Sequence, residues 1–186
     1  MGNLGSISNA IYSQGWDYEF VSSPEQFDLI SHLVIPGVGS YSAAMSKLTS
    51  MKLIDPIKNF AEDLNPIMGI CLGMQILSEF GTEGGDTKGL GLIDGQVLTL
   101  EKSKQFPLPH VGWNEISIKD ECNILGGVKT NVDFYFVHSF FFETDEDNII
   151  SLTDYGITFP SIVKKNNVVG VQFHPEKSQA NGLKII

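Results

Sequence analysis

A cysteine flanked by glycines is the first group in this sequence that could carry out chemistry. Cys71 lies in the segment Gly-Ile-Cys-Leu-Gly-Met-Gln at residues 69–75, which follows a short apolar run and precedes an apolar pattern typical of a helix. Glycines two residues to either side permit a tight strand-to-helix turn, the pattern of a nucleophile elbow. A thiol at a helix N-terminus is also favoured as the reactive thiolate. A buried structural cysteine would fit the same seven residues, so both interpretations stay open.

A second chemical group lies near the C-terminus, where His174 and Glu176 flank a proline. The residue before a proline favours an extended backbone, and side chains two residues apart in an extended chain share a face. The imidazole and the carboxylate are therefore predicted to lie side by side. A carboxylate beside an imidazole sets its tautomer and stabilises its charged form, as in a nucleophilic triad. Alone, this segment could be an exposed polar turn; with Cys71 it completes a Cys-His-Glu set.

The other three histidines offer alternative roles. His32 begins a predicted strand, and His110 lies in a loop rich in proline and glycine, where it could serve structure or partner contact. His138 lies in an aromatic strand, which favours a hydrogen-bonded core histidine. Neither C-x-x-C nor H-x-x-x-H spacing is present, so no metal site is predicted.

The Pro-Gly-Val-Gly segment at residues 36–39 follows a predicted strand and precedes a predicted helix. It lacks the third glycine of a dinucleotide fingerprint and the Gly-Lys-Ser/Thr of a phosphate loop, and no cofactor is predicted. Its backbone N–H groups are available to an anion. For a thiol enzyme that anion would be a tetrahedral oxyanion, with the N–H of Leu72 as a second donor.

Apolar periodicity predicts an α/β framework that positions these residues. Helices are predicted over residues 3–14 with Asn3 as the cap, from Ser23, from Ser40 and over 53–64, and strands over 18–21, 32–35, 67–71, 95–100, 111–118, 134–142 and 149–153. Residues 161–165 and 168–173 are predicted to form a hairpin, and 81–91 a glycine-rich loop. The alternating first half favours a parallel sheet, to which the second half adds antiparallel strands. Without repeats or a long linker, residues 1–186 are predicted to form a single domain.

The composition limits the partners and the compartment. The 186 residues carry 12 Lys and Arg against 22 Asp and Glu, a formal net charge of −10, which argues against nucleic acid and anionic membranes. No apolar run approaches the roughly 18 to 20 residues needed to cross a bilayer, and the start of the sequence lacks the pattern of a signal peptide. Cys71 and Cys122 are too far apart to suggest a disulfide framework, so a cytoplasmic location is expected.

Taken together, the motifs resemble those of the class I glutamine amidotransferases. The cysteine elbow and the His-Pro-Glu segment mark the whole class, and further segments are similar to the glutaminase subunits of imidazole glycerol phosphate synthase. These segments are Met-Gly-Asn-Leu at 1–4, Leu-Val-Ile-Pro-Gly-Val-Gly at 33–39, Gly-Leu-Gly-Leu-Ile at 89–93, Pro-His-Val-Gly-Trp-Asn at 109–114, Tyr-Phe-Val-His-Ser at 135–139 and Gly-Val-Gln-Phe-His-Pro-Glu-Lys-Ser at 170–178. The resemblance implies a flavodoxin-like α/β fold, with a mixed, mostly parallel central sheet flanked by helices.

The resemblance also implies a mechanism. Cys71 would attack the side-chain amide of glutamine and form a γ-glutamyl thioester, while His174 would protonate the departing ammonia and then activate water, oriented by Glu176. The amides of Val38 and Leu72 would form the oxyanion hole, the former after its loop reorients. Glutamine would be held near Gly37, Gln75, His138 and Ser139, without a cofactor or a metal.

The partner implied by the resemblance is a (β/α)₈-barrel cyclase subunit, in a heterodimer that makes imidazole glycerol phosphate and AICAR in histidine biosynthesis. Asn3, Trp113, Tyr135 and Lys177 match positions near that interface. Two alternatives stay open. One is a paralogous glutaminase subunit that supplies ammonia to a synthetase aminating a surface-polysaccharide sugar. The other is a non-catalytic partner or regulatory subunit.

The sequence departs from the family pattern in two places. Relatives usually open with an apolar strand that leads into Asp-Tyr-Gly ahead of Met-Gly-Asn-Leu, so a first strand is expected to be missing here. Phe140 and Phe141 stand where tyrosines are common, which removes hydroxyls that could contact a partner or the substrate.

Overall fold

Two β-sheets and five α-helices make up the part of the chain that the computed structural model describes, residues 4–186. The Asn3 cap and the interface role expected for Asn3 lie outside these residues. The helices are α1 (Leu4–Ser13), α2 (Tyr41–Ser50), α3 (Ile54–Glu62), α4 (Leu72–Gln75) and α5 (Gln179–Leu183), with 3₁₀ turns η1 (Pro24–Leu29), η2 (Asn123–Leu125), η3 (Glu146–Asn148) and η4 (Pro175–Lys177). None of the described helices is both long and apolar enough to cross a membrane.

The larger sheet has seven strands in the order β1-β2-β11-β10-β9-β6-β7. Their bounds are β1 (Leu33–Gly37), β2 (Ile67–Cys71), β6 (His110–Ile118), β7 (Val132–His138), β9 (Ile149–Asp154), β10 (Thr158–Lys165) and β11 (Val168–Val171). The mixed α/β fold is confirmed, but the sheet is not mostly parallel. Only β1, β2 and β11 pair in parallel, and the remaining neighbours are antiparallel. Parallel neighbours need a long crossover, such as the one that carries α2 and α3, whereas the later strands are joined by shorter connections.

The smaller sheet has the order β4-β3-β5-β8, with β3 (Phe80–Gly81), β4 (Thr87–Lys88), β5 (Gln96–Thr99) and β8 (Phe140–Glu143). Two predictions are corrected here. The glycine-rich segment 81–91 contains strand residues as well as loop, and the predicted strand 134–142 is divided at Ser139. Its two halves enter different sheets, β7 beside β6 and β8 beside β5.

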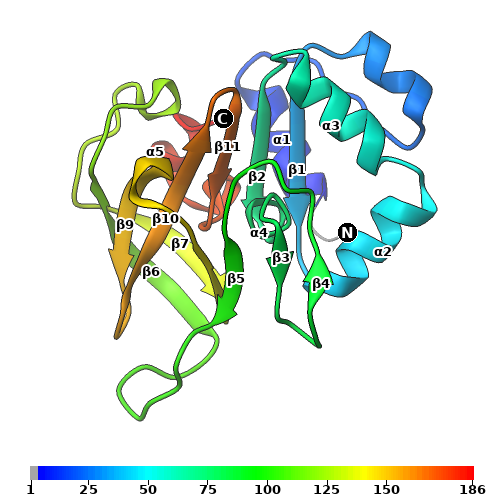
Figure 1. Ribbon diagram of the computed structural model, residues 1–186. Helices are drawn as coiled ribbons and strands as arrows, with labels where there is room; N and C mark the ends of the chain where they lie inside the picture. Colours follow the sequence, from blue (N-terminus) through cyan, green and yellow to red (C-terminus); the bar gives the residue numbers. More distant parts are fainter. Residues whose placement is uncertain (1–3) are drawn as a thin grey trace.

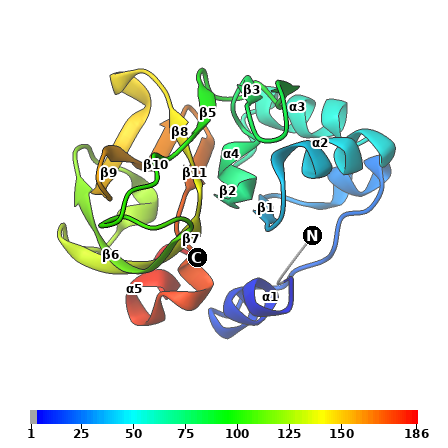
Figure 2. The ribbon, with the colours of Figure 1, turned by 90° about the horizontal axis from the view of Figure 1, so that it is seen from below.

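Helices cover both faces of the parallel strands (Figures 1 and 2). On one face lie α2 and α3, whose apolar residues pack with Leu33 and Ile35 of β1 in one core cluster. On the other face lies α1, whose Ile7 belongs to a second cluster with Ile70 of β2 and Phe134 of β7. The sheet therefore separates two cores, and β2 contributes to both.

Two local predictions are wrong. Residues 18–21 form no strand. Among the described strands β1 is at one edge of the larger sheet and pairs only with β2, so residues 18–21 do not pair with it. The apolar pattern after the elbow is typical of a longer helix, but α4 ends at Gln75. The carbonyls of residues 76–78 accept hydrogen bonds from the backbone N–H groups of residues 90–93. These bonds take the place of the intrahelical bonds that a further turn of α4 would make.

Candidate active site

The three parallel strands bring the predicted chemical groups to one edge of the larger sheet. β1 ends at Gly37, which pairs with Cys71 at the end of β2, and Val171 at the end of β11 pairs with Ile70. The carboxyl ends of parallel strands lie on the same side, so the Pro-Gly-Val-Gly loop, the cysteine and His174 meet there.

The turn at Cys71 has the strained backbone of a nucleophile elbow. Its φ and ψ are 54° and −111°, an uncommon combination for a residue other than glycine. The turn also places α4 directly on the strands. The approach is so close that a Cβ at Gly73 would overlap the carbonyl oxygen of Ile35. Likewise, a Cβ at Gly69 would lie 2.6 Å from the carbonyl oxygen of Gly73. The two glycines are thus required by close packing, as the sequence pattern predicts.

The imidazole of His174 is paired with the carboxylate of Glu176. The distance from Nδ1 to Oε1 is 2.9 Å, and the two side chains are 3% and 4% exposed. The predicted proximity is confirmed, but the predicted extended backbone holds only for His174, whose φ and ψ are −99° and 96°. Glu176 lies in the 3₁₀ turn η4, which folds its carboxylate back onto the ring.

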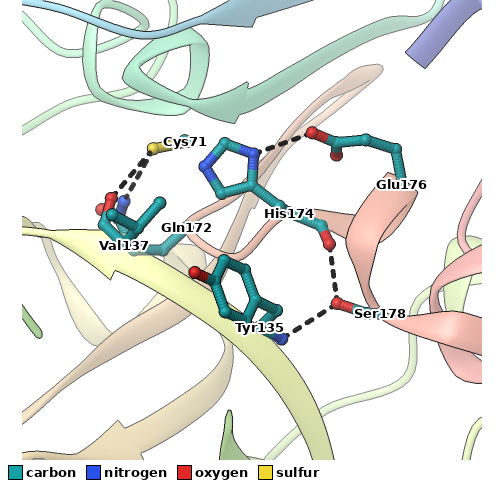
Figure 3. A network of polar contacts seen from close by, with 7 residues as sticks. All are labelled: Cys71, Tyr135, Val137, Gln172, His174, Glu176 and Ser178. Atoms are coloured by element: carbon teal, nitrogen blue, oxygen red, sulfur yellow. Dashed lines mark hydrogen bonds and ion pairs between the residues drawn. The ribbon is translucent and has the colours of Figure 1, made fainter. Parts of the chain in front are cut away.

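Backbone hydrogen bonds fix the position of His174 (Figure 3). Its N–H donates to the carbonyl of Tyr135 at 2.8 Å, and its carbonyl accepts from the Ser178 hydroxyl at 2.6 Å. The same hydroxyl oxygen accepts from the N–H of Tyr135 at 2.9 Å. The catalytic segment is thereby attached to β7, a strand from a different part of the chain.

The sulphur of Cys71 lies on the opposite side of the imidazole from Glu176 (Figure 3). Its Sγ is 3.8 Å from the carbonyl oxygen of Val137 and 3.8 Å from Nε2 of Gln172. The Nε2 atom of His174 is buried and has no hydrogen-bond partner among the described residues. This ring nitrogen is therefore available to exchange a proton with a molecule bound at the cysteine.

The charge environment favours the protonated form of His174. Burial lowers the pKa of His174, but the Cys71 sulphur and the Glu176 carboxylate outweigh it and raise the pKa to about 9. The ring therefore carries a proton near neutral pH. A cation beside the sulphur stabilises a thiolate, and the same proton can be given to a leaving amine.

A cavity of about 270 Å³ opens at this edge of the sheet. Residues predicted for the site line it, namely Val38, Cys71, Leu72, Gln75, His138, Ser139 and His174. Gly37 does not line the cavity; it lies at the end of β1, where an added Cβ would lie 2.9 Å from Cβ of Leu72. Leu72 is the first residue of α4, where a backbone N–H has no partner within the helix and can bind an anion.

Two polar residues at the site carry no role in the sequence prediction. Gln172 is fully buried, and its Oε1 accepts from Nε2 of Gln75 at 3.1 Å. The pattern of an extended chain could have indicated it, because alternate side chains of such a segment share a face and Gln172 lies two residues before His174. Glu83 lines the cavity and accepts a hydrogen bond from the N–H of Tyr41 at 2.7 Å. No local signal in its glycine-rich segment could have identified Glu83.

The other two buried histidines form a pair beside the cavity. Nδ1 of His110 lies 2.9 Å from Nε2 of His138. Burial lowers the pKa of His110 to about 4 and the pKa of His138 to about 3, so both rings are neutral at pH 7. The predicted loop position of His110 is wrong, since it is the first residue of β6. Within residues 4–186, no group of three or more His, Cys, Asp or Glu side chains could hold a metal ion.

Three residues predicted at a partner interface lie together on one surface. Trp113 and Tyr135 pair across β6 and β7, with ring centroids 6.0 Å apart. The Nζ atom of Lys177 lies 5.7 Å from the centroid of the Tyr135 ring. Trp113 is 48% exposed and its neighbour on the same face, Val111, 55%. This aromatic surface adjoins the catalytic segment.

Comparisons with known proteins agree on the family. The family described as Glutamine amidotransferase class-I matches residues 2–185. The chain is 44% identical over 187 residues to "Imidazole glycerol phosphate synthase subunit HisH" of Archaeoglobus fulgidus, covering 100% of this chain and 91% of the relative. It is 39% identical over 186 residues to the protein of that name in Desulfitobacterium hafniense, covering 100% and 87%.

Solved structures support the same fold. "Structure of PurLQS from Thermotoga maritima" has a TM-score of 0.76 at 20% sequence identity, covering 97% of this chain and 88% of that one. "Crystal structure of glutamine amidotransferase" has a TM-score of 0.75 at 17% identity, covering 98% and 90%.

Proposed function

The chain belongs to the class I glutamine amidotransferases, and from that premise we propose that it is the glutamine-hydrolysing subunit of an imidazole glycerol phosphate synthase. The similarity to subunits of that name extends over the whole chain. The observation that carries the proposal is the cavity lined by Cys71 and by His174, whose ring is paired with Glu176. We take residues 1–186 as one amidotransferase domain, which the family match over residues 2–185 supports.

The first half-reaction begins with the Cys71 thiolate. Its Sγ attacks the side-chain carbonyl carbon of glutamine, an S–C bond forms, and the carbonyl electron pair moves to oxygen. The backbone N–H of Leu72 at the start of α4 stabilises this oxyanion, with that of Val38 as the second donor after its loop reorients. When the C–N bond breaks, Nε2 of His174 gives its proton to the leaving nitrogen, which departs as ammonia and leaves a γ-glutamyl thioester.

The second half-reaction uses the now neutral His174 as a base. It removes a proton from water, the resulting hydroxide attacks the thioester carbon, and the Cys71 thiolate leaves as glutamate is released. Glu176 holds Nδ1 through the 2.9 Å contact, so that Nε2 faces the reacting atoms in both steps.

Substrate binding is assigned to the polar groups of the cavity wall. Nε2 of Gln75 donates to the carbonyl of Phe140 at 3.0 Å and to Oε1 of Gln172. The Oε1 atom of Gln75 is then left to accept a hydrogen bond from the substrate. Glu83 adds a carboxylate that can bind the α-ammonium group of glutamine. His138 and Ser139 complete the wall, and Gly37 acts indirectly, by supporting Leu72.

The second subunit of the synthase is a cyclase, which we propose to be a (β/α)₈ barrel that docks on the surface of Trp113, Tyr135 and Lys177. Exposed aromatic residues beside the catalytic segment suit such an interface. The names of the relatives favour the histidine pathway over a surface-polysaccharide acceptor, and the complete Cys-His-Glu set favours a catalytic over a regulatory subunit. We place the subunit in the cytoplasm, where the free thiols of Cys71 and Cys122 would stay reduced.

Reconstitution with a histidine-pathway cyclase subunit tests the proposal. The pair should form imidazole glycerol phosphate with glutamine as the nitrogen source, whereas the cyclase alone should require ammonium salt. Replacing the chain by its Cys71→Ala variant should abolish the glutamine-dependent reaction and preserve the ammonium-dependent one. A pair that uses only ammonium would contradict the proposed function.

A further inference from the structure

A chain of hydrogen bonds leads from the β6 strand to the wall of the cavity. Nδ2 of Asn114 lies 3.4 Å from Nε2 of His110, whose Nδ1 lies 2.9 Å from Nε2 of His138. Nδ1 of His138 in turn lies 2.8 Å from the carbonyl oxygen of Phe140. His138 and Phe140 line the cavity, whereas His110 and Asn114 lie behind it.

The chemistry of the two ends fixes the direction of every bond in this chain. A carbonyl oxygen can only accept, so Nδ1 of His138 carries a hydrogen and, in the neutral ring, its Nε2 must accept. His110 therefore donates through Nδ1, and its own Nε2 accepts from Asn114. The Asn114 amide is oriented independently, since Nδ2 also donates to the carbonyl of Asp154 at 2.8 Å and Oδ1 accepts from the N–H of Glu115 at 2.9 Å.

Aromatic packing prevents the His110 ring from turning away from this arrangement. The ring stacks on Tyr155 with centroids 3.9 Å apart and on Phe136 with centroids 5.1 Å apart. His110 and His138 are 2% and 5% exposed, so water does not readily replace their partners. His110 is thus a buried, oriented donor that the hydrolytic steps above do not use.

The position of His138 gives this arrangement a consequence for catalysis. His138 shares the cavity with His174, the imidazole that carries the transferable proton. The titratable groups near the histidine pair are His174, Cys71 and Glu83, which line the same cavity as His138, and Tyr155, which stacks on His110. Because burial keeps the His138 ring neutral, His110 acts through the tautomer and orientation of that ring and not through its charge.

We propose that His110 is a positioning residue for amide hydrolysis, which donates to Nε2 of His138 and thereby holds the buried, neutral His138 ring in one tautomer and one orientation. The part of the cavity wall that His138 forms beside Cys71 and His174 is thereby fixed. The inference rests on the proposed function, because its catalytic effect is exerted on the glutaminase reaction. It also explains why a histidine and an asparagine occur four residues apart in the Pro-His-Val-Gly-Trp-Asn segment.

Two variants of His110 separate hydrogen bonding from packing. His110→Phe keeps a ring between Phe136 and Tyr155 but has no donor, whereas His110→Asn loses the stacked ring but keeps an amide N–H near the position of Nδ1. In the reconstituted synthase, His110→Phe should lower kcat/KM for glutamine about tenfold or more at both pH 6 and pH 8.5, because Nε2 of His138 loses its donor. His110→Asn should restore kcat/KM to within about threefold of the parent at both pH values, although it lacks the stacked ring.

The outcomes decide between positioning and packing. A His110→Phe variant with the kcat/KM of the parent overturns the proposal, and so does a His110→Asn variant that is no more active than His110→Phe. If His110→Phe does not fold, ¹⁵N-histidine NMR of the unaltered chain decides. Both rings should be neutral and protonated at Nδ1 at pH 7, and a hydrogen on Nε2 of His138 overturns the proposal. The parent synthase could also release no ammonia from glutamine although these tautomers are found. In that case the proposed function is wrong, and the hydrogen bonds between His110 and His138 have only a structural role.

Discussion

The Nδ1 atom of His174 lies 2.9 Å from Oε1 of Glu176, in a pair whose side chains are 3% and 4% exposed. Burial alone lowers the pKa of the imidazole and favours its neutral form. With the Glu176 carboxylate, and with the Cys71 sulphur on the other side, the ring stays protonated until the pH approaches 9. Among the described histidines, this separates His174 from His110 and His138, which burial keeps neutral. The site therefore contains one imidazole that carries a proton at neutral pH beside a pair that does not.

Glu176→Gln should move the alkaline limb of the glutaminase pH profile. Cys71 and Glu176 together raise the pKa of His174 from 6.5 to about 9, and the amide keeps the shape of the Glu176 side chain while it removes the carboxylate's share of that effect. We expect the upper limb of kcat/KM to shift to lower pH by about one to two units, the usual effect of losing a close opposite charge. Initial rates of ammonia release between pH 6 and 10 measure the shift. An unchanged upper limb would remove Glu176 from this role.

The same substitution should change stability in a pH-dependent manner. Because the folded-state pKa of His174 is raised from 6.5 to about 9, its contribution to stability is complete below pH 6.5 and is lost as the pH rises through about 9. Glu176→Gln should therefore lower the free energy of unfolding more at pH 6 than at pH 10. Urea denaturation at the two pH values measures this difference. A larger loss at pH 10 would contradict the assignment.

Cys71→Ala should eliminate glutamine hydrolysis without unfolding the chain. The thiol is the only nucleophile placed at the elbow, and loss of a triad member commonly costs about 10⁴-fold or more. The smaller side chain leaves the positive φ at this position and the packing of α4 unchanged. Ammonia release and binding to the cyclase partner should be measured together. Activity that persists in a variant that still binds the partner would exclude Cys71 as the nucleophile.

Glu83→Gln should weaken glutamine binding through the charge of the cavity wall. The amide oxygen can still accept from the N–H of Tyr41, so the capping of α2 is kept while the carboxylate is lost. We expect KM for glutamine to rise about tenfold or more, with a smaller change in kcat. A matched control is the substrate analogue that lacks the α-amino group. If Glu83 binds that group, parent and variant should hydrolyse the analogue with similar KM values.

Gly73→Ala should be strongly destabilising, whereas Gly5→Ala should not. A Cβ at Gly73 would overlap the backbone carbonyl of Ile35, and neither side of this contact can move without displacing α4 from the sheet. A Cβ at Gly5 in α1 meets nothing within 4 Å. We expect the free energy of unfolding to fall by about 3 kcal/mol or more for Gly73→Ala. For Gly5→Ala it should rise by about 0.5 kcal/mol. Equal values for the two variants would show that α4 does not need this close approach.

The sequence by itself determined the features that depend on neighbouring residues. Two glycines around Cys71 predict the elbow, because only a residue without a Cβ allows α4 to lie against β1 and β2. The spacing of His174 and Glu176 predicts their proximity, although the turn that produces it is η4 rather than an extended strand.

Only the tertiary structure decided the features that depend on distant segments. The strand predicted at 18–21 fails because a strand needs a hydrogen-bonding neighbour, which the described sheet does not place there. Gln172, Glu83 and the His110–His138 pair acquire their significance from contacts between residues far apart in the chain. Their hydrogen bonds form when segments far apart in the chain meet at one cavity, and local spacing carries no information on that meeting.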